Sequence, residues 1–334
     1  MDLSFNMKVS IVIPVYNAEL YLEQCVRSLM MQTHQNIEYL FVDDASSDNS
    51  IHLLKSLIDQ YSSRKDQCVI FENKENKGVA FCRRIGMKNA TGDFIIQVDS
   101  DDYVALDFIE KMLKKALETQ SDVVICNFSK VYKNKIKVNS YFQELERSGL
   151  IKNLLIGTAH NALWNKLVRR SIIVDENLYP DDSFRLLEDK SITFRIIYFA
   201  NKVAFINESL YFYRKRENSL TDINQRVLMP MLKSLLVLVD DFFNIHPSDE
   251  TIDSGIDTFK VGVAASLLIY KPDDEDLPTL LKEIPISLIK TNNYIPIYYK
   301  VALYAKKLGM PWLVSTIRYI IDLHSGYNKS KKTS

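Results

Sequence analysis

Three features are missing from this chain of 334 residues: a surplus of charge, paired cysteines and a long uncharged apolar run. Lysine plus arginine and aspartate plus glutamate number 42 each, so no overall field attracts nucleic acid, and we expect no nucleic-acid partner. The four cysteines form no CxxC pair, which indicates buried thiols of a reducing cytosol rather than a disulfide framework. No apolar run reaches the ~18 residues of a membrane span, and we recognise no signal peptide. We therefore expect a globular protein of the cytoplasm.

Glycine-rich phosphate loops are missing as well. Neither GxGxxG nor GxxxxGKS/T follows the first predicted strand. A diphosphate bound by this chain would need another source of positive charge. A divalent cation held by carboxylates would supply that charge.

The sequence does contain a regular alternation of apolar strands and amphipathic helices over its first 130 residues. Side chains with helical spacing lie between the strands, at residues 22–30, 51–58 and 108–117. Continuous apolar strands joined by helices predict a doubly wound α/β domain, with a mostly parallel sheet covered on both faces. The predicted strands are Val9–Pro14, Glu38–Val42, Cys68–Glu72, Phe94–Val98 and Asp122–Phe128.

The alternation stops near residue 131. Residues 132–138 are basic and predict a loop or hairpin, and residues 148–220 mix short elements. After Thr221 the pattern is helical to the end of the chain. We predict one domain over residues 1–220, with halves 7–130 and 131–220, and a helical C-terminal region over 221–334.

Polar residues follow three of the predicted strands, where ligands of such sheets bind. The first strand leads into Pro14-Val15-Tyr16-Asn17, the second into Asp43-Asp44-Ala45-Ser46, and the fourth into Asp99-Ser100-Asp101-Asp102. One aromatic ring and up to five carboxylates are thus expected at one edge of the sheet.

The last of these segments is a candidate cation site, because closely spaced carboxylates repel one another unless a cation or water intervenes. Asp99 and Asp101 fit the first positions of an EF-hand calcium loop, but Val104 occupies the position that requires glycine. A short aspartate motif after a strand better suits Mg²⁺ or Mn²⁺. A solvated acidic turn is the alternative.

Five segments together resemble a known family. "VSIVIPVYNAELYLEQCVRSLMMQTHQNIEYLFVDDASSDNS" is similar to the opening of a family 2 glycosyltransferase of the GT-A fold. "NKGVAFCRRIGMKNATGDFIIQVDSDDYV" is similar to the segment that ends in that family's DxD motif. The segments "WNKLVRRSII", "LEDKSITFRIIYFA" and "SLYFYRKRENSLT" resemble its acceptor-side half. The resemblance covers residues 7–221 and implies a nucleotide-sugar-binding half followed by an acceptor-side half.

The resemblance implies a role for each matching residue on the nucleotide side. Pro14 and Tyr16 are expected to flank the nucleobase. Asp44, with Asp43 as the alternative, is expected to hydrogen-bond the base edge. Arg83 is expected to face the nucleotide or the sugar.

The resemblance also implies the residues around the reacting sugar. Asp99 touches the ribose or sugar, with Ser100 counted among the donor-binding residues, and Asp101 ligates a divalent cation, Mn²⁺ or Mg²⁺. Asp189, in the pair Glu188-Asp189, matches the catalytic base. The remaining implied contacts are Trp164 and Lys166 on the sugar or acceptor side, and Arg214 and Arg216 closing over the diphosphate.

Three residues depart from the family pattern. Ala45 replaces the usual glycine, so we expect that turn to avoid positive φ. Arg84 stands where asparagine is common, and Leu187 precedes Glu188 where glycine is usual.

Several of these residues also have purely structural explanations. Tyr16 could be a turn aromatic, Asp43 and Asp44 could be turn formers, and Trp164 could belong to the core. The Glu188-Asp189 pair could serve only the helix dipole.

The expected activity is inverting transfer of a hexose or N-acetylhexosamine from a UDP-sugar to the hydroxyl of a saccharide or lipid-linked saccharide. Surface polysaccharide or lipid-linked oligosaccharide assembly is the expected setting. The alternative is a non-catalytic GT-A-fold partner that binds a glycan or nucleotide. Residues 295–323 mix aromatic, apolar and basic side chains, which suits either docking at the inner face of the plasma membrane or packing on the catalytic domain.

Overall fold

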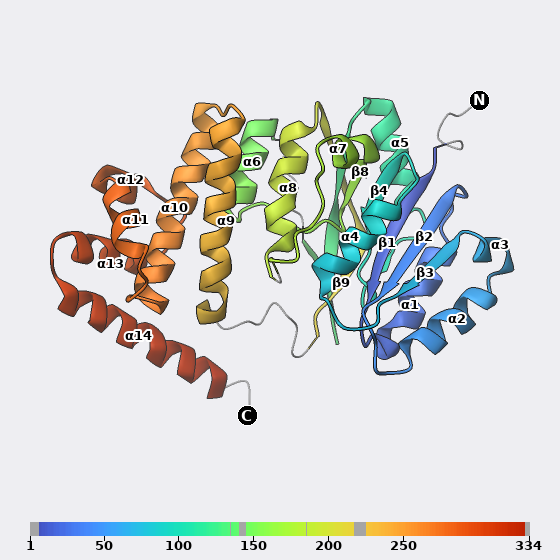
Figure 1. The fold of residues 1–334 in the computed structure, drawn as a ribbon, viewed down its shortest axis with the longest axis horizontal. Coiled ribbons are helices and arrows are strands. Elements are labelled where there is room, and N and C mark those ends of the chain that lie inside the picture. The colour runs from blue at the N-terminus through green and yellow to red at the C-terminus, as the bar shows by residue number, and fades with distance from the viewer. Residues whose placement is uncertain (1–6, 134, 140–144, 185, 217–224, 331–334) are drawn as a thin grey trace. The chain divides into compact units, whose positions relative to one another are not determined.

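The computed structural model describes residues 7–133, 135–139, 145–184, 186–216 and 225–330 (Figure 1). The chain divides into two compact units, residues 1–154 with 159–219, and residues 155–158 with 220–334. The first unit is built on one mixed sheet in the order β3-β2-β1-β4-β8-β6-β9-β5, with β7 paired to β6. The strands are β1 (Val9–Val15), β2 (Ile37–Asp43), β3 (Cys68–Glu72), β4 (Phe94–Gln97), β5 (Tyr103–Val104), β6 (Val123–Tyr132), β7 (Lys135–Asn139), β8 (Lys166–Arg169) and β9 (Val203–Arg214).

The four strands β3, β2, β1 and β4 form a parallel half, as the sequence predicts. Every residue of β1 and β2 is buried, which is the pattern of parallel strands covered on both faces. The helices of this unit are α1 (Glu19–Met30), α2 (Ser50–Asp59), α3 (Ser62–Lys65), α4 (Val79–Asn89), α5 (Phe108–Thr119), α6 (Arg147–Ile156), α7 (Arg170–Asp175) and α8 (Glu188–Phe199).

The other half of the sheet is mixed, so the expectation of a mostly parallel sheet holds only for the first half. Strand β8 is antiparallel to β4 and to β6, and β9 runs parallel to β6. The basic segment predicted as a loop or hairpin is the β6–β7 hairpin. The 12-residue strand β9 was not predicted, although its end is rich in aromatic residues.

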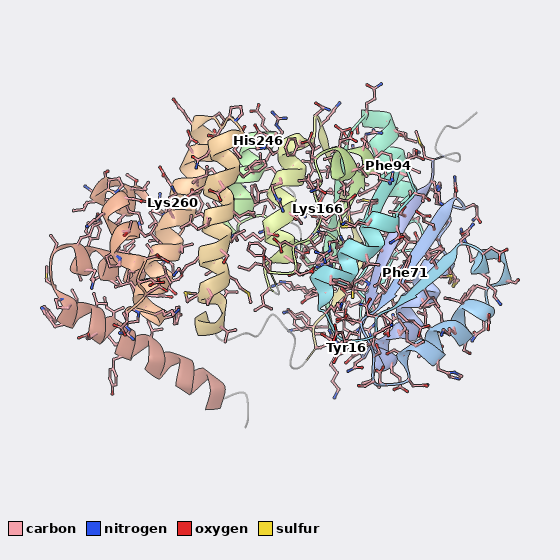
Figure 2. The ribbon with its side chains drawn as sticks, in the orientation of Figure 1. Tyr16, Phe71, Phe94, Lys166, His246 and Lys260 are labelled. Atoms are coloured by element: carbon pink, nitrogen blue, oxygen red, sulfur yellow. The ribbon has the colours of Figure 1, made fainter. Side chains whose placement is uncertain are left out.

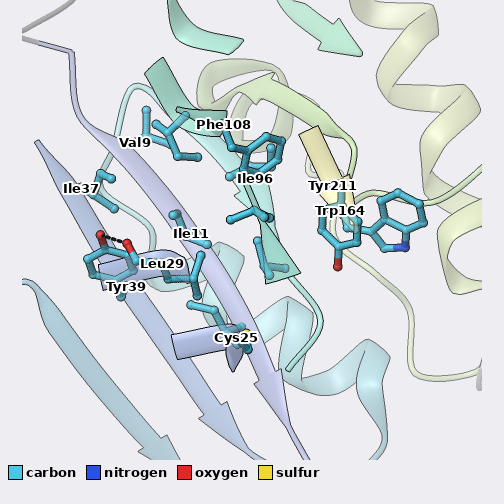
Figure 3. Packing of buried hydrophobic residues seen from close by; sticks show 14 of the residues in the cluster. Val9, Ile11, Cys25, Leu29, Ile37, Tyr39, Ile96, Phe108, Trp164 and Tyr211 are labelled. Carbon is cyan, nitrogen blue, oxygen red and sulfur yellow. Dashed lines mark hydrogen bonds between the residues drawn. The ribbon is translucent and has the colours of Figure 1, made fainter. Parts of the chain in front are cut away.

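The two faces of β1 pack against different helices. Ile11 and Ile13 belong to the cluster that includes Leu22 and Leu29 of α1 and Met112 of α5. Figure 3 shows Ile11 of this cluster near Leu29. On the opposite face, Val12 lies against Gly86 of α4, where an added Cβ would approach the valine methyl to 2.3 Å. Helix α4 therefore packs unusually close to the sheet, because glycine leaves room for it.

The carboxyl ends of the parallel strands form the edge on which the predicted site residues gather. Tyr16 directly follows β1 at this edge, whereas Phe94 begins β4 toward the opposite edge (Figure 2). The connections at this edge carry the acidic segment after β4 and the loop before α4.

The second unit is helical, as predicted for the C-terminal region. Of the helices described, none is long and apolar enough to cross a membrane. They are α9 (Gln225–Ile245), α10 (Glu250–Tyr270), α11 (Leu277–Glu283), α12 (Ile286–Thr291), α13 (Ile297–Lys307) and α14 (Pro311–Ser330).

Candidate functional site

The acidic segment after β4 folds into a tight turn. One carboxylate oxygen each from Asp99, Asp101 and Asp102 lies within 4.8 Å of the others, and Ser100 is buried among them. The backbone N–H of Asp102 donates to the carbonyl of Asp99 at 3.0 Å, which closes the turn. The end of strand β4 thus holds three carboxylates in the space of one coordination sphere.

Arg83 on α4 connects this turn to the pair that begins α8. Its guanidinium is buried and donates to Asp99 Oδ1 at 2.8 Å, and to Asp189 Oδ1 at 2.7 Å. A third carboxylate, Glu188 Oε1, lies 2.5 Å from the same Nη1 atom. The structure therefore gathers the proposed donor-side aspartate and the proposed base around one guanidinium.

The charges in this cluster shift one another's pKa values. Burial alone would lower the pKa of Arg83, but Asp189, Asp99 and Glu188 raise it above its ordinary value. Burial, and then the charge on Asp189, raises the pKa of Glu188 to about 7, although Arg83 opposes the rise. Burial likewise raises the pKa of Asp189, against the effect of Arg83. One guanidinium cannot fully compensate three partly buried carboxylates, so the cluster can accept a further positive charge or a proton.

Asp101 faces a second guanidinium. Its carboxylate forms an ion pair with Arg216, which follows β9. Burial, followed by the charge on Asp99, raises the pKa of Asp101 to about 6, while Arg216 lowers it. Arg214 donates to Gln24 Oε1 at 2.6 Å and lies over the ring of Tyr21 at 4.8 Å. The backbone N–H of Arg214 donates to Asp102 Oδ1, so both arginines predicted for the diphosphate side lie beside the acidic turn.

The residues predicted to hold the nucleobase lie at the ends of β1 and β2. Pro14 is buried in β1 opposite Val42, and Tyr16 is 50% exposed just beyond the strand. The buried carboxylate of Asp44 accepts from the backbone N–H groups of Lys77 and Gly78 at 2.8 and 2.7 Å. It therefore fastens the loop that leads into α4.

Asp43 has a similar local role. It accepts from the Ser46 hydroxyl at 2.5 Å and from the Ser46 backbone N–H. These turn-forming contacts support the structural explanation for the aspartate pair, and a role in base recognition stays a prediction.

Trp164 and Lys166 are both buried. The buried Trp164 ring stacks on Tyr211, with centroids 4.2 Å apart, and is part of the central cluster (Figure 3). This placement favours the core role for Trp164. Lys166 is buried, and its Nζ donates to the carbonyls of His160 and Ala162 at 2.8 and 2.7 Å, so it ties down the segment before β8.

The expectation that Ala45 avoids positive φ is wrong. Ala45 has φ 58°, so the turn after β2 keeps the left-handed conformation although a Cβ is present. Leu187 has φ 71° directly before α8 and also keeps that conformation. Arg84, the third departure, pairs with Asp182.

The sequence reasoning missed Tyr211 as part of the site. Its buried hydroxyl donates to Asp102 Oδ2 at 2.9 Å and accepts from the Asp99 backbone N–H at 3.1 Å. The motif "SLYFYR" was a usable signal, because a run of aromatic residues is typical of a strand.

The acidic turn fits a divalent cation by the chemistry of its donors. All three candidate ligands are carboxylates, the oxygen ligands that suit Mg²⁺ and Mn²⁺. The ion pair between Arg216 and Asp101 shows that the turn already accommodates positive charge. The residues present therefore fit such an ion.

Comparisons with known proteins agree with this geometry. The family model described as Glycosyl transferase family 2 matches residues 10–175. The putative glycosyltransferase EpsH of Bacillus subtilis is 32% identical over 263 residues, which cover 76% of this chain and 74% of EpsH.

Two solved structures share the fold. Residues 1–349 of S. aureus TarS in complex with UDP-GlcNAc match with a TM-score of 0.71 at 19% identity, over 95% of this chain and 92% of that chain. The mannosyltransferase PcManGT from Pyrobaculum calidifontis in complex with GDP-Man and Mn²⁺ matches with a TM-score of 0.54 at 13% identity, over 94% of this chain and 86% of that one. The resemblance found in the sequence is thus confirmed: the chain belongs to glycosyl transferase family 2 and is a glycosyltransferase with the GT-A fold.

Proposed function

We propose that this enzyme transfers a hexose or N-acetylhexosamine from a UDP-sugar to an acceptor hydroxyl with inversion at the anomeric carbon. The observation that carries the proposal is the shared guanidinium of Arg83, which contacts both Asp99 and Asp189. Because both carboxylates meet at one guanidinium, the contacts support a donor-side aspartate and a base that act on the same bound sugar.

The nucleotide would lie along the ends of β1 and β2. Pro14 and the exposed ring of Tyr16 would flank the base, and Asp44, or else Asp43, would accept from the base edge. Arg83 has a further donor to offer, because its buried Nε has no hydrogen-bond partner among the described residues. An oxygen of the donor sugar or phosphate would satisfy it.

Asp101 is the residue we assign to a divalent cation, Mn²⁺ or Mg²⁺. Such an ion would offset the charge that develops on the diphosphate when the glycosidic bond breaks. Arg214 and Arg216 would add positive charge on the same side, from the end of β9.

Asp189 is the residue we assign as general base. It would take the proton of the acceptor hydroxyl as that oxygen attacks the anomeric carbon from the face opposite the diphosphate. A single displacement of this kind inverts the anomeric configuration. Burial raises the pKa of Asp189, which makes its carboxylate a better proton acceptor.

The two solved structures support the donor class without naming the sugar. TarS is in complex with UDP-GlcNAc, and PcManGT with GDP-Man and Mn²⁺. We place the acceptor in surface polysaccharide or lipid-linked oligosaccharide assembly in the cytoplasm. A lipid-linked acceptor would agree with peripheral membrane contact through the C-terminal helices.

A panel of UDP- and GDP-sugars with Mn²⁺ or Mg²⁺, assayed for hydrolysis and transfer, tests the donor. Asp189→Asn should retain UDP binding and lose about 10²–10⁴ in turnover, because a positioned base typically contributes that much. Asp101→Asn should instead lose cation-dependent UDP binding, because it removes a charged ligand.

Glu188→Gln is the matched control, since it removes the neighbouring carboxylate from the same guanidinium. We expect it to retain far more turnover than Asp189→Asn. If Glu188→Gln were inactive and Asp189→Asn active, the base would be the other member of the pair. Full turnover in both variants would refute a base at the start of α8.

A further inference from the structure

Tyr211 and Asp102 form a closed hydrogen-bonded link between the acidic turn and β9. The Tyr211 hydroxyl accepts from the Asp99 backbone N–H and donates to Asp102 Oδ2, at 3.1 and 2.9 Å. The other oxygen, Oδ1, accepts from the backbone N–H of Arg214 at 2.7 Å. Asp102 is fully buried, so these donors replace the water that its two oxygens would otherwise bind.

Backbone pairing extends the same link. Strand β5, which directly follows Asp102, is antiparallel to β9, with Tyr103 opposite Phe212 and Val104 opposite Tyr211. The rings of Tyr103 and Phe212 stack with centroids 4.7 Å apart. The end of β9 therefore cannot shift without moving the acidic turn.

The residues positioned by this link are the ones with proposed contacts to the donor. Arg214 lies two residues after Phe212. Arg216, two residues further along the chain, forms an ion pair with Asp101. Side chains of Asp99 and Asp101 are 24% and 15% exposed, whereas Asp102 has no exposed surface. Only the first two carboxylates are open to a ligand from solvent.

We propose that Asp102 is not a cation ligand, although it is the third carboxylate of the turn, and that Asp102 and Tyr211 are positioning residues. They fix the distance between Asp101 in the acidic turn and Arg214 and Arg216 at the end of β9, so that a cation and a diphosphate fit between them. The inference rests on the proposed function. Its consequence is that removing the Tyr211 hydroxyl, which lies outside the cation site, weakens cation-dependent nucleotide binding.

The test compares full-length wild type with Tyr211→Phe, Asp102→Asn and Asp101→Asn. Isothermal titration measures UDP binding with Mn²⁺ present, and electron paramagnetic resonance counts bound Mn²⁺ in the presence of UDP. Tyr211→Phe should weaken UDP binding about tenfold, because it leaves the buried Oδ2 atom of Asp102 without its donor and frees the acidic turn from β9. It should still bind one Mn²⁺ at saturating UDP, as should Asp102→Asn, whereas Asp101→Asn should not.

Tyr213→Phe is the control, since it removes a hydroxyl two residues along the same strand and should bind UDP like wild type. Unchanged UDP binding in Tyr211→Phe would overturn this inference but not the proposed function. Loss of the Mn²⁺ in Asp102→Asn, with full retention in Tyr211→Phe, would make Asp102 a ligand and overturn it too. A wild-type chain that binds no nucleotide with Mn²⁺ would overturn the proposed function and this inference with it.

Discussion

Arg216 and the proposed cation would both bind the carboxylate of Asp101. In the structure, the guanidinium pairs with that carboxylate, and it also lies 5.5 Å from the ring centre of Tyr21. A cation on Asp101 would therefore displace Arg216 from its present partner. The released guanidinium would then be available to the diphosphate, which is the better match for it.

Arg216→Ala should shift two affinities in opposite directions. Binding of Mn²⁺ alone should tighten by up to about fivefold, because a partly exposed ion pair of about 0.2–1 kcal/mol no longer competes. Binding of UDP in the presence of Mn²⁺ should weaken about tenfold, because a charged donor is lost. Paramagnetic resonance of free Mn²⁺ gives the first affinity, and calorimetry gives the second.

Lys215→Ala is the control for Arg216→Ala, because it removes a neighbouring cation from the same end of β9. It should leave the Mn²⁺ affinity unchanged. If Arg216→Ala changed the Mn²⁺ affinity and the UDP affinity in the same direction, this would contradict competition between Arg216 and the cation for Asp101.

Single residues also show where sequence reasoning reached its limit. The resemblance identified positions 45 and 187 as special, because glycine is usual there, and both have positive φ in the structure. The inference that Ala45 would avoid this conformation failed, since surrounding contacts can hold a residue in the left-handed region at a cost of about 1–2 kcal/mol. The backbone N–H of Asp44 donates to the Val15 carbonyl at 2.9 Å, and such contacts fix the turn.

At the scale of elements, the closeness of α4 to the sheet places Arg83. Gly86 lies three residues after Arg83 on the same helix and faces the buried Val12 of β1. Arg83 in turn reaches both the acidic turn and the start of α8. The helix-to-sheet distance is therefore part of the site's geometry.

Gly86→Ala should destabilise the protein by about 1–3 kcal/mol, because the added methyl would overlap Val12 and force the helix outward. The same displacement should lower turnover, since Arg83 moves with the helix. Thermal unfolding and the donor assay measure the two effects. Unchanged stability in this variant would show that α4 relaxes without cost.

Gly149→Ala is the matched control for Gly86→Ala. Gly149 lies in α6, where an added Cβ would meet Leu145 only at 3.8 Å. Stability there should stay the same or rise, because alanine is the better helix former by about 1 kcal/mol. Turnover should be unaffected.

The elements that the sequence predicted are the ones with simple patterns. All five predicted strands occur, since continuous apolar runs between helices admit few other structures. Strand β9 was missed because exposed residues such as Asn207 and Glu208 interrupt its apolar pattern, where its pairing with β6 shifts register. Strand β8 has only four residues, too few to show a period. Contacts such as those of Tyr211 depend on these missed pairings, so the positioning link was beyond sequence reasoning.

At the scale of the whole molecule, charge is balanced overall but not locally. Residues 284–321 contain no aspartate or glutamate, and their charged residues are Lys290, Lys300, Lys306, Lys307 and Arg318. Large apolar side chains in the same stretch are exposed, among them Ile297, Leu308, Trp312 and Tyr319. Trp312 and Tyr319 are seven residues apart on α14, so they share one face of that helix. Exposed aromatics among lysines are typical of helices that lie on anionic lipid.

The full-length protein should therefore co-float with vesicles that contain phosphatidylglycerol and not with vesicles of phosphatidylcholine alone. The double substitution Lys306→Glu and Lys307→Glu should reduce this binding at least about tenfold, because each basic residue near the surface contributes about 1 kcal/mol. Trp312→Ser should also weaken it, through loss of the apolar contact. Raised salt should release the protein, since screening shortens the reach of the lysines.

Ile245→Ser is the control for this surface, because Ile245 is an even more exposed apolar residue at the end of α9, outside the basic stretch. It should leave vesicle binding unchanged. Equal flotation with neutral and anionic vesicles would contradict a charge-directed surface. If wild type did not float at all, and Trp312→Ser instead shifted the protein to a smaller species in size-exclusion chromatography, this face would be covered by a second copy of the chain rather than by lipid.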